Sequence, residues 1–305
     1  MSAPILALVG PTCTGKSRIA ALLAKERNCA ILSADSMQVY RGMDIGTGKA
    51  FDDFGDVRVF GLDVTDPSEP YSSALYQTYG RGVIDAELAS TGRIIVCGGT
   101  GFYVRALLDR MDFAPGEQTG NHIRDKYTSM AAEDGPQAVW EALRALDPAS
   151  AASVHPNNVK RVIRALEMTE AGESYAQRAD AFSSIQEAYP HVAVAFSYPR
   201  ELLYDRINAR VDAMFESGLV DEVRGLFAQG LGDSLTANQA IGYKEIIAHL
   251  AGECTLAEAT EAIKQATRRY AKRQISWFKR DPRVHWIDGM LPESEKLTII
   301  KGLWE

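Results

Sequence analysis

Eight consecutive residues near the start of the chain have the types and spacing of a phosphate-binding loop. They are Gly10, Pro11, Thr12, Cys13, Thr14, Gly15, Lys16 and Ser17. They lie between a short apolar run and a helical pattern, which is the context that such a loop requires. Its glycines let backbone N–H groups converge on an anion, Lys16 supplies a charge for the outer phosphates, and the Ser17 hydroxyl suits Mg²⁺. The segment is therefore interpreted as a P-loop that holds a chain of phosphates. The motif does not indicate which reaction those phosphates undergo.

Asp35 follows the next apolar run, Ala30–Ser33. The carboxyl ends of parallel strands meet at one edge of a sheet, so its carboxylate is expected beside the phosphate loop. There it could act as a base or as a metal ligand, and the alternative is that it caps a following helix.

A glycine-rich turn, Gly98–Gly101, follows the run Arg93–Cys97. P-loop ATPases usually end a second strand in an Asp that holds the metal, and this run has none. The turn is interpreted either as a plain strand-to-helix connection or as part of the site, to which Thr100 contributes a hydroxyl group.

Basic residues are concentrated towards the end of the chain. From Lys264 to Arg283 there are eight Lys or Arg and one acid, Asp281, although the whole chain has a formal net charge of −7. In a helix, Arg268 and Lys272 would be neighbours of like charge, which is unfavourable unless an anion binds nearby. The stretch is interpreted as a surface for a polyanion, with a solvated helix face as the alternative.

Strands that alternate with helices must position these residues. Short runs rich in Ile and Val predict strands, and amphipathic patterns between them predict helices, as in an α/β fold whose parallel sheet is covered on both faces. The expected strands are Ile5–Val9, Ala30–Ser33, Arg93–Cys97, Val192–Phe196 and Val284–Ile287. The expected helices are Lys16–Glu26, Ser73–Ala89, Phe102–Arg110, Leu202–Ser217, Val220–Gln229, Tyr243–Ala251 and Leu256–Arg280.

The pattern changes between about Ala114 and Pro190, where we find helical patterns but no convincing strand. These patterns are His122–Ala132, Gln137–Leu146 and Asn158–Glu170. We therefore expect a P-loop NTPase-like core with a parallel sheet flanked by helices, formed by residues 1–113 and 191–305. Residues 114–190 are expected to form an all-helical insertion domain.

The composition excludes several classes of protein. With 46% hydrophobic and 24% charged residues among 305, the chain is neither generally disordered nor a globally basic nucleic-acid coat. No apolar run approaches the roughly 18 residues of a membrane helix, and no signal peptide is recognisable. The four cysteines lack the spacing of a zinc site or a disulfide framework, so we expect free thiols in a cytoplasmic protein.

Taken together, these motifs resemble the tRNA dimethylallyltransferase family, also called the tRNA isopentenyltransferases. Besides GPTCTGKS, the resemblance is carried by DSMQVYRGMDIGTGKA, DPSEPYS, GGTGFYVRALL, HPNNVKRVIRALE, RVDAMFESGLVDEV, NQAIGYKE and RRYAKRQISWFKRD. These blocks follow one another in order from Ile5 to about Asp281. No Cys/His cluster follows the core, so the resemblance is to the compact bacterial type.

The resemblance implies a transferase that modifies tRNA. Such an enzyme transfers the dimethylallyl group from dimethylallyl diphosphate to the exocyclic amine of an adenosine. This adenosine is 3′-adjacent to the anticodon in tRNAs reading codons that begin with U. The P-loop would then hold the released diphosphate, which agrees with the missing second Asp. The implied partners are the tRNA anticodon stem-loop and dimethylallyl diphosphate, the implied cofactor is Mg²⁺ on Ser17, and we expect a monomer.

The resemblance also implies roles for individual residues. Asp35 would accept the proton of the amine and Thr100 would orient it, while Arg210 would join residues 10–17 in binding the diphosphate or nucleotide. A stacked adenosine must be flipped out to react, so residues must also hold the RNA. Those expected to contact tRNA are Asp35, Ser36, Met37, Gln38, Thr100, Arg124, Lys160, Arg161, Val162, Ile163, Arg164, Gly242, Tyr243, Lys244, Lys272, Arg273, Gln274 and Trp277.

Three other functions share some of these features. An adenylate isopentenyltransferase would use the P-loop but would need neither the Lys160–Arg164 run nor the basic C-terminal helix. A small-molecule kinase would transfer a phosphate from ATP bound to the same loop. A non-catalytic RNA-binding module would not need Lys16, Ser17, Asp35 and Thr100.

Overall fold

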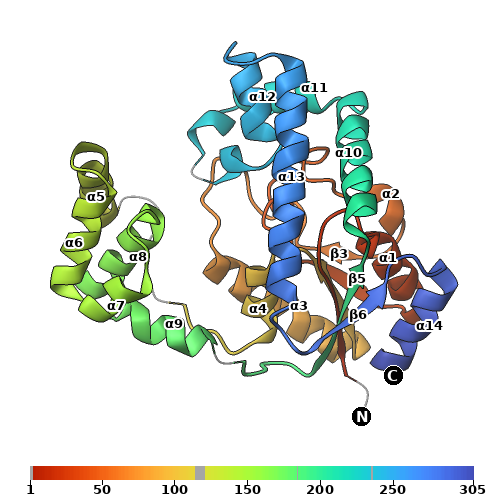
Figure 1. Ribbon diagram of the computed structural model, residues 1–305. Helices are drawn as coiled ribbons and strands as arrows, with labels where there is room; N and C mark the ends of the chain where they lie inside the picture. Colours follow the sequence, from red (N-terminus) through yellow and green to blue (C-terminus); the bar gives the residue numbers. More distant parts are fainter. Residues whose placement is uncertain (1–2, 114–120, 184, 235) are drawn as a thin grey trace. The chain divides into compact units, whose positions relative to one another are not determined.

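The computed structural model describes residues 3–113, 121–183, 185–234 and 236–305 (Figure 1). It divides into two compact units, of which the larger is formed by Met1–Leu108 with Ala188–Glu305 and the smaller by Asp109–Glu187. The sequence analysis placed the ends of the insertion at 114 and 190. The segment expected at its first boundary, Ala114 to Gly116, lies outside the described residues.

The larger unit is built on a six-stranded parallel sheet with the order β3-β2-β4-β1-β5-β6. Its strands are β1 (Ile5–Val9), β2 (Ala30–Ser33), β3 (Val59–Phe60), β4 (Ile94–Gly98), β5 (His191–Ser197) and β6 (Val284–Asp288). Every residue of β1, β2 and β4 is buried, which is why these strands read as unbroken apolar runs. Val9 lies beside Gly98 and Ser33 beside Cys97, so the loops after these three strands leave the sheet at one edge.

Helices cover both faces of this sheet (Figure 1). Alternate residues of β1 show the two layers, because Ile5, Ala7 and Val9 belong to one core and Leu6 and Leu8 to the other. The helices of this unit are α1 (Lys16–Arg27), α2 (Phe51–Phe54), α3 (Ser73–Thr91), α4 (Gly101–Leu108), α10 (Arg200–Glu216), α11 (Leu219–Ala228), α12 (Tyr243–Leu250), α13 (Leu256–Phe278) and α14 (Glu293–Trp304), with two 3₁₀ turns, η1 (Leu231–Asp233) and η2 (Ala237–Gln239). In the described ranges, no helix has the length and apolar character to cross a membrane.

The longest of these helices, α13, carries the basic stretch. It begins with a capping box, in which the Thr255 hydroxyl accepts from the N–H of Glu258 and the Glu258 carboxylate accepts from the N–H of Thr255. Its buried side chains recur at helical spacing, namely Ala259, Ile263, Ala271, Gln274 and Phe278. This stripe packs α13 on the core and leaves its charged residues on the opposite side.

The smaller unit consists of α5 (His122–Glu133), α6 (Pro136–Leu146), α7 (Pro148–Ser153), α8 (Val159–Glu170) and α9 (Tyr175–Ser183). Its core includes Tyr127, Val139, Leu143, Val162 and Leu166. Among the residues described in this unit, the regular elements are all helices, and an isolated bridge pairs Asp109 with Glu187.

The parallel sheet flanked by helices confirms the predicted α/β fold. Three strands or α-helices of the larger unit were missed, and one of them is α2, which has only four residues. Strand β3 has only two residues, which pair with Ile31 and Leu32, and is too short to leave a pattern. Helix α14 had a readable signal, because Leu297, Ile300 and Trp304 recur at helical spacing and pack on the α1 side of the sheet.

Candidate active site

The loop between β1 and α1 is curled by three residues with positive φ. Gly10 has φ 116°, Gly15 has φ 81°, and the non-glycine Cys13 has φ 64°. A left-handed residue next to a right-handed one turns neighbouring N–H groups towards a common point, where they can face an anion. The loop leads directly into the N-terminus of α1, which begins at Lys16.

Lys16 lies inside this loop. Its ammonium donates to the carbonyl oxygen of Pro11 at 2.5 Å and to the Thr14 hydroxyl at 3.4 Å. Burial lowers the pKa of Lys16, and the positive charge of Arg210 acts in the same direction, whereas Asp35 opposes it. Both acceptors that Lys16 has among the described residues are neutral, so an incoming anion would gain a charge-assisted hydrogen bond to this buried ammonium.

Asp35 is held by a turn directly after β2. Its Oδ1 accepts from the N–H of Met37 at 2.9 Å. The segment after Asp35 forms turns, and the next helix, α2, has Ala50 at its N-cap, so Asp35 does not cap a helix. Burial raises the pKa of Asp35, although the Met37 N–H and the charges of Lys16 and Arg210 oppose that shift. A raised carboxyl pKa beside a phosphate loop is the property expected of a general base.

Thr100 ties the glycine-rich turn to the Asp35 loop. Its Oγ1 accepts from the N–H of Ser36 at 3.0 Å and lies 3.3 Å from the Ser36 hydroxyl oxygen, and its own N–H donates to the carbonyl oxygen of Ala34. A Cβ on Gly98 would lie 2.3 Å from that Ala34 oxygen, so only glycine allows this approach. The turn is therefore both a strand-to-helix connection and the element that sets Thr100 beside Asp35.

Arg210 reaches the site from α10. Its Nη2 lies 3.4 Å from the carbonyl oxygen of Gly48, and a Cβ on Gly48 would overlap the guanidinium. Its charge lowers the pKa of both Lys16 and Asp35, which places it in their surroundings. The structure thus brings the P-loop, Asp35, Thr100 and Arg210 to one edge of the sheet.

The amide of Gln38 is engaged within the protein. Its Oε1 accepts from the Ser33 hydroxyl at 2.8 Å, and its Nε2 donates to the carbonyl oxygens of Thr47 (3.2 Å) and Gly48 (3.3 Å). Gln38 was expected to contact tRNA, and the structure shows it supporting the loop against which Arg210 lies.

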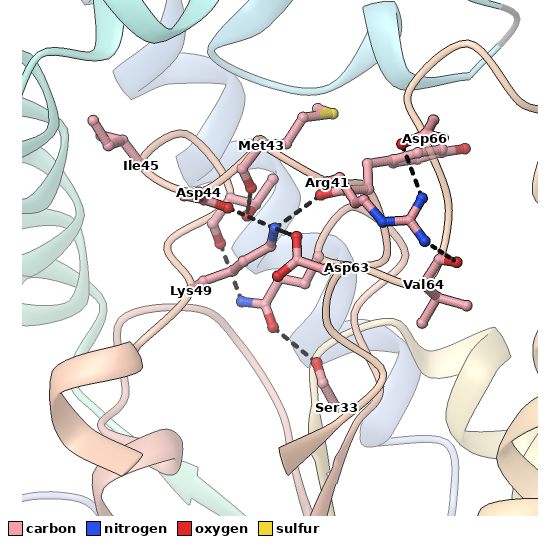
Figure 2. A network of polar contacts seen from close by, with 12 residues as sticks. Ser33, Arg41, Met43, Asp44, Ile45, Lys49, Asp63, Val64 and Asp66 are labelled. Carbon is pink, nitrogen blue, oxygen red and sulfur yellow. Dashed lines mark hydrogen bonds and ion pairs between the residues drawn. The ribbon is translucent and has the colours of Figure 1, made fainter. Parts of the chain in front are cut away.

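Lys49 organises the same loop, and the sequence analysis gave it no role (Figure 2). Its side chain is 0% exposed, and its ammonium donates to Oδ1 of Asp44 and of Asp63 at 2.6 Å each and to the carbonyl oxygen of Tyr40 at 2.8 Å. These acceptors satisfy all three ammonium protons, which is what makes a buried lysine tolerable. No spacing rule could have found this contact, because the fold alone brings Asp63 to Lys49.

Replacing Lys49 with Met should destabilise the protein. The substitution keeps the length of the side chain but leaves Asp44 and Asp63 close together without their cation. We expect the free energy of unfolding to fall by about 2–3 kcal/mol, because a hydrogen bond to a charged group contributes about 1.5–3 kcal/mol. Denaturant unfolding at pH 7 would measure this, with exposed Lys25→Met as the control, and equal stability of the two variants would contradict it.

Glu222, on α11, closes the other side of this loop. Its carboxylate accepts from the N–H groups of Asp44 (3.0 Å), Ile45 (2.7 Å) and Gly46 (3.1 Å) and from the hydroxyl of Tyr243 (2.6 Å). Tyr243 is fully buried, and burial raises the pKa of its hydroxyl well above the ordinary value. Tyr243 was expected to contact tRNA, and its side chain instead packs in the core.

Gly242 and Lys244, the sequence neighbours of Tyr243, were also expected to contact tRNA. Gly242 has φ 99° and its N–H donates to the Glu245 carboxylate at 2.8 Å, which starts helix α12. Lys244 is exposed, with its ammonium 3.5 Å from Glu245. Among the three predicted tRNA contacts Gly242, Tyr243 and Lys244, it is Lys244 that has an exposed, charged side chain.

The basic stretch on α13 contains paired and unpaired cations. Arg268 lies 2.7 Å from a Glu261 oxygen, and Lys264 lies 2.6 Å from an Asp212 oxygen. Within the described ranges, no acidic group lies within ion-pair distance of five exposed cations of the stretch, which are Arg269, Lys272 and Arg273 on α13 and Lys279 and Arg280 directly after it. This exposed set is the part of the stretch available to an anionic partner.

Two other expected tRNA contacts on α13 lie differently. The Trp277 ring is 37% exposed and meets the Phe102 ring edge-on, with 6.5 Å between centroids. Gln274 is buried, and its amide contacts the backbone of Thr12 and of Gly99. The exposed part of Trp277 is available for stacking with a base, whereas Gln274 contacts the phosphate loop.

The predicted contacts in the smaller unit also separate into two groups. Arg124 on α5 and Arg164 on α8 both pair with the buried carboxylate of Glu167 on α8, at 2.6 and 2.9 Å, and the Arg124 pair joins the two helices. Val162 and Ile163 are buried in the core of that unit. The predicted contacts with exposed side chains are Lys160 and Arg161.

Two family models match the chain. One, described as IPP transferase, covers residues 38–281, and the other, described as isopentenyl transferase, covers residues 3–58. The first spans most of the larger unit and the whole of the smaller one, including Thr100, Arg210 and α13. The second includes the phosphate loop and Asp35.

Curated relatives and solved structures agree with these matches. The chain is 43% identical to the tRNA dimethylallyltransferase of Streptomyces coelicolor, over 96% of this chain and 93% of that one, and 44% identical to that of Thermobifida fusca, over 95% and 91%. The crystal structure of the full-length tRNA isopentenylpyrophosphate transferase from Bacillus halodurans superposes with a TM-score of 0.71 at 38% identity, covering 98% of this chain and 95% of that one. A eukaryotic dimethylallyltransferase acting on tRNA gives a TM-score of 0.79 at 27% identity, covering 94% and 74%. This chain therefore belongs to the tRNA dimethylallyltransferase, or IPP transferase, family.

Proposed function

We propose that this chain transfers the dimethylallyl group of dimethylallyl diphosphate to the exocyclic amine of the adenosine 3′-adjacent to the anticodon, in tRNAs reading codons that begin with U. The observation that carries the proposal is the position of Asp35, a half-buried carboxylate with a raised pKa, beside the Lys16 loop. A base next to a diphosphate site suits alkylation of an amine, in a chain that belongs to this family.

The chemical step needs a proton acceptor. The amine nitrogen attacks C1 of the allyl group, the bond from C1 to the diphosphate oxygen breaks, and its electron pair leaves with the diphosphate. An aromatic amine is a poor nucleophile, so the step is assisted when the Asp35 carboxylate takes the amine proton. The Thr100 hydroxyl, which accepts from the N–H of Ser36, is proposed to orient the amine.

The leaving diphosphate gathers negative charge as the bond breaks. Lys16, Arg210 and the loop N–H groups stabilise this charge from fixed positions, which costs no reorganisation during the reaction. The Ser17 hydroxyl, together with the oxygens of a bound diphosphate, offers the oxygen ligands that Mg²⁺ prefers. When bound, Mg²⁺ would supply further neutralisation of the diphosphate.

The exposed cations of α13 are proposed to bind the tRNA backbone, and the exposed Lys160 and Arg161 of the smaller unit are proposed to do the same. Trp277 offers an exposed ring on which a base can stack. Since Lys16, Asp35, Thr100 and Arg210 all come from one chain, we propose that a monomer is active, and the tRNA substrate indicates the cytoplasm.

Transfer of labelled dimethylallyl groups tests the proposal. Purified protein with Mg²⁺ receives either an anticodon stem-loop carrying the target adenosine or free AMP. Label on the RNA alone is expected. Label on AMP would indicate a free-nucleotide prenyltransferase, and label on neither would overturn the proposal and direct attention to kinase activity with ATP.

The exposed cations of α13 predict a salt-dependent interaction. Lys272→Glu combined with Arg273→Glu should weaken stem-loop binding and reduce the slope of log affinity against log salt by about 2, since each phosphate contact contributes about 0.7–0.9 to that slope. Filter binding between 50 and 200 mM salt would measure the slope, with Lys25→Glu on α1 as a charge control. An unchanged slope would leave these residues as a solvated helix face.

A further inference from the structure

Gln274 lies far from the phosphate loop in sequence but contacts it directly. Its Oε1 accepts from the N–H of Thr12 at 3.0 Å, and its Nε2 donates to the carbonyl oxygen of Gly99 at 2.9 Å. The residue is only 5% exposed. Both ends of the amide are therefore engaged within the site, and little of it remains for RNA.

The Thr12 N–H and the Pro11 carbonyl belong to one peptide unit. In a trans peptide these two groups point in opposite directions. Here the N–H meets Gln274 on one side, while the carbonyl oxygen accepts from the Lys16 ammonium at 2.5 Å and from the Thr14 hydroxyl at 2.9 Å on the other. Holding the N–H thus fixes the direction of the carbonyl that positions Lys16.

The amide of Gln274 is itself fixed. A Cβ on Gly99 would lie 2.1 Å from Nε2, so the glycine-rich turn is shaped around this side chain. The Tyr270 hydroxyl, one helical turn earlier on α13, is near the side chains of Thr100 and Gln274, which partly offset the rise in its pKa that burial causes. The glycine turn and α13 together hold the amide against the phosphate loop.

We propose that Gln274 is a positioning residue of the diphosphate site, which locks the Pro11–Thr12 peptide so that its carbonyl holds Lys16 towards the bound diphosphate. This proposal rests on the proposed function. It gives Gln274 a role in binding the prenyl donor instead of the RNA contact that its sequence block suggested. Without this lock the peptide can rotate, and Lys16 loses the acceptor that directs it.

Two substitutions test the proposal. Gln274→Met keeps the length of the side chain and removes both hydrogen bonds. Gln274→Glu keeps an acceptor for the Thr12 N–H, loses the donor to Gly99 and adds a negative charge beside the diphosphate, so it remains informative if the Met variant fails to fold. Gln265→Met, an exposed glutamine on the same helix, is the matched control.

Titration calorimetry with inorganic diphosphate, without RNA, is the first measurement. We expect both Gln274 variants to bind diphosphate about tenfold more weakly than wild type and the control, while stem-loop affinity stays within twofold. Weaker stem-loop binding with unchanged diphosphate affinity would overturn the proposal. Wild-type protein that bound no diphosphate and transferred no label would instead remove the proposed function itself.

A double-mutant cycle separates positioning of Lys16 from general support of the loop. The kcat/KM for dimethylallyl diphosphate is measured for Gln274→Met in wild-type and in Lys16→Ala protein. Because Gln274 is proposed to act through Lys16, the substitution should lower kcat/KM about tenfold in the first background and less than twofold in the second. Equal losses in both would show that Gln274 does not act through Lys16.

Discussion

Asp35→Asn is expected to lower the rate of prenyl transfer by about 10²–10⁴-fold, the range over which general bases contribute. Asn has the same shape, and its Oδ1 can still accept from the N–H of Met37, which lies 2.9 Å from Oδ1 of Asp35. It cannot accept the proton of the amine. The change therefore removes the base and leaves the turn that carries it.

Single-turnover transfer to an anticodon stem-loop would measure this rate. Affinity for the stem-loop should stay within a few fold, because the exposed cations of α13 are unchanged. Ser36→Ala in the same turn is the comparison that keeps the carboxylate. Near-normal turnover of Asp35→Asn would exclude Asp35 as the base.

The pH dependence of the wild-type enzyme provides a second readout. Burial raises the pKa of Asp35 above the ordinary value of 3.8, so the carboxyl group is protonated, and unable to act as a base, over a wider acidic range. The transfer rate should fall as pH decreases through this raised pKa. The residual rate of Asp35→Asn should lack that acidic limb.

The same burial has a consequence for stability. A carboxyl group whose pKa is raised in the folded state binds its proton more tightly there than in the unfolded chain. Its contribution to stability is therefore present at low pH and is lost as pH rises through the raised pKa. Asp35→Asn should thus raise the free energy of unfolding at pH 7, and this gain should shrink as pH falls through the raised pKa, because Asp35 itself then becomes neutral.

The centre of the site could be predicted from the sequence because its signals are local. The glycines and Lys16 of the loop identify a phosphate site within eight residues, and Asp35 and Thr100 each follow a buried strand of a parallel sheet. Strand order then brings the two loops together, as the contact between Thr100 and the N–H of Ser36 shows. Site residues that directly follow a strand can therefore be predicted from each short segment of sequence separately.

The surrounding residues could not be predicted in this way. Blocks of the family pattern contain side chains that face the core and side chains that face solvent, and the block does not distinguish them. Tyr243 and Gln274 were expected at the RNA but are buried, because each meets a residue from a distant part of the chain. Thr12 and Gln274 are 262 positions apart, and only the fold brings them into contact.

Lys16→Ala is expected to lower kcat/KM for dimethylallyl diphosphate by about 10²–10³-fold, comparable with the loss of one preorganised donor to a developing anion. Lys16 is the buried cation of the loop and already faces neutral acceptors, Pro11 and Thr14. Burial lowers the pKa of Lys16, because it disfavours the charged ammonium. A bound diphosphate would stabilise that ammonium and would itself be held by its charge. Without the Lys16 ammonium, Arg210 still supplies a positive charge to the site. In the wild-type protein this charge lowers the pKa of both Lys16 and Asp35.

Steady-state transfer at varied donor and fixed stem-loop concentration measures this loss, with Lys25→Ala on the same helix as the control. Stem-loop affinity of Lys16→Ala should match wild type, because Lys16 is buried in the loop and the exposed cations of α13 are intact. The loss should exceed that of Gln274→Met, since Gln274 orients the ammonium while Lys16 carries it. A variant that kept its donor kinetics and lost RNA affinity would show that this loop does not bind the diphosphate, and the assignment of leaving-group stabilisation to Lys16 would fall with it.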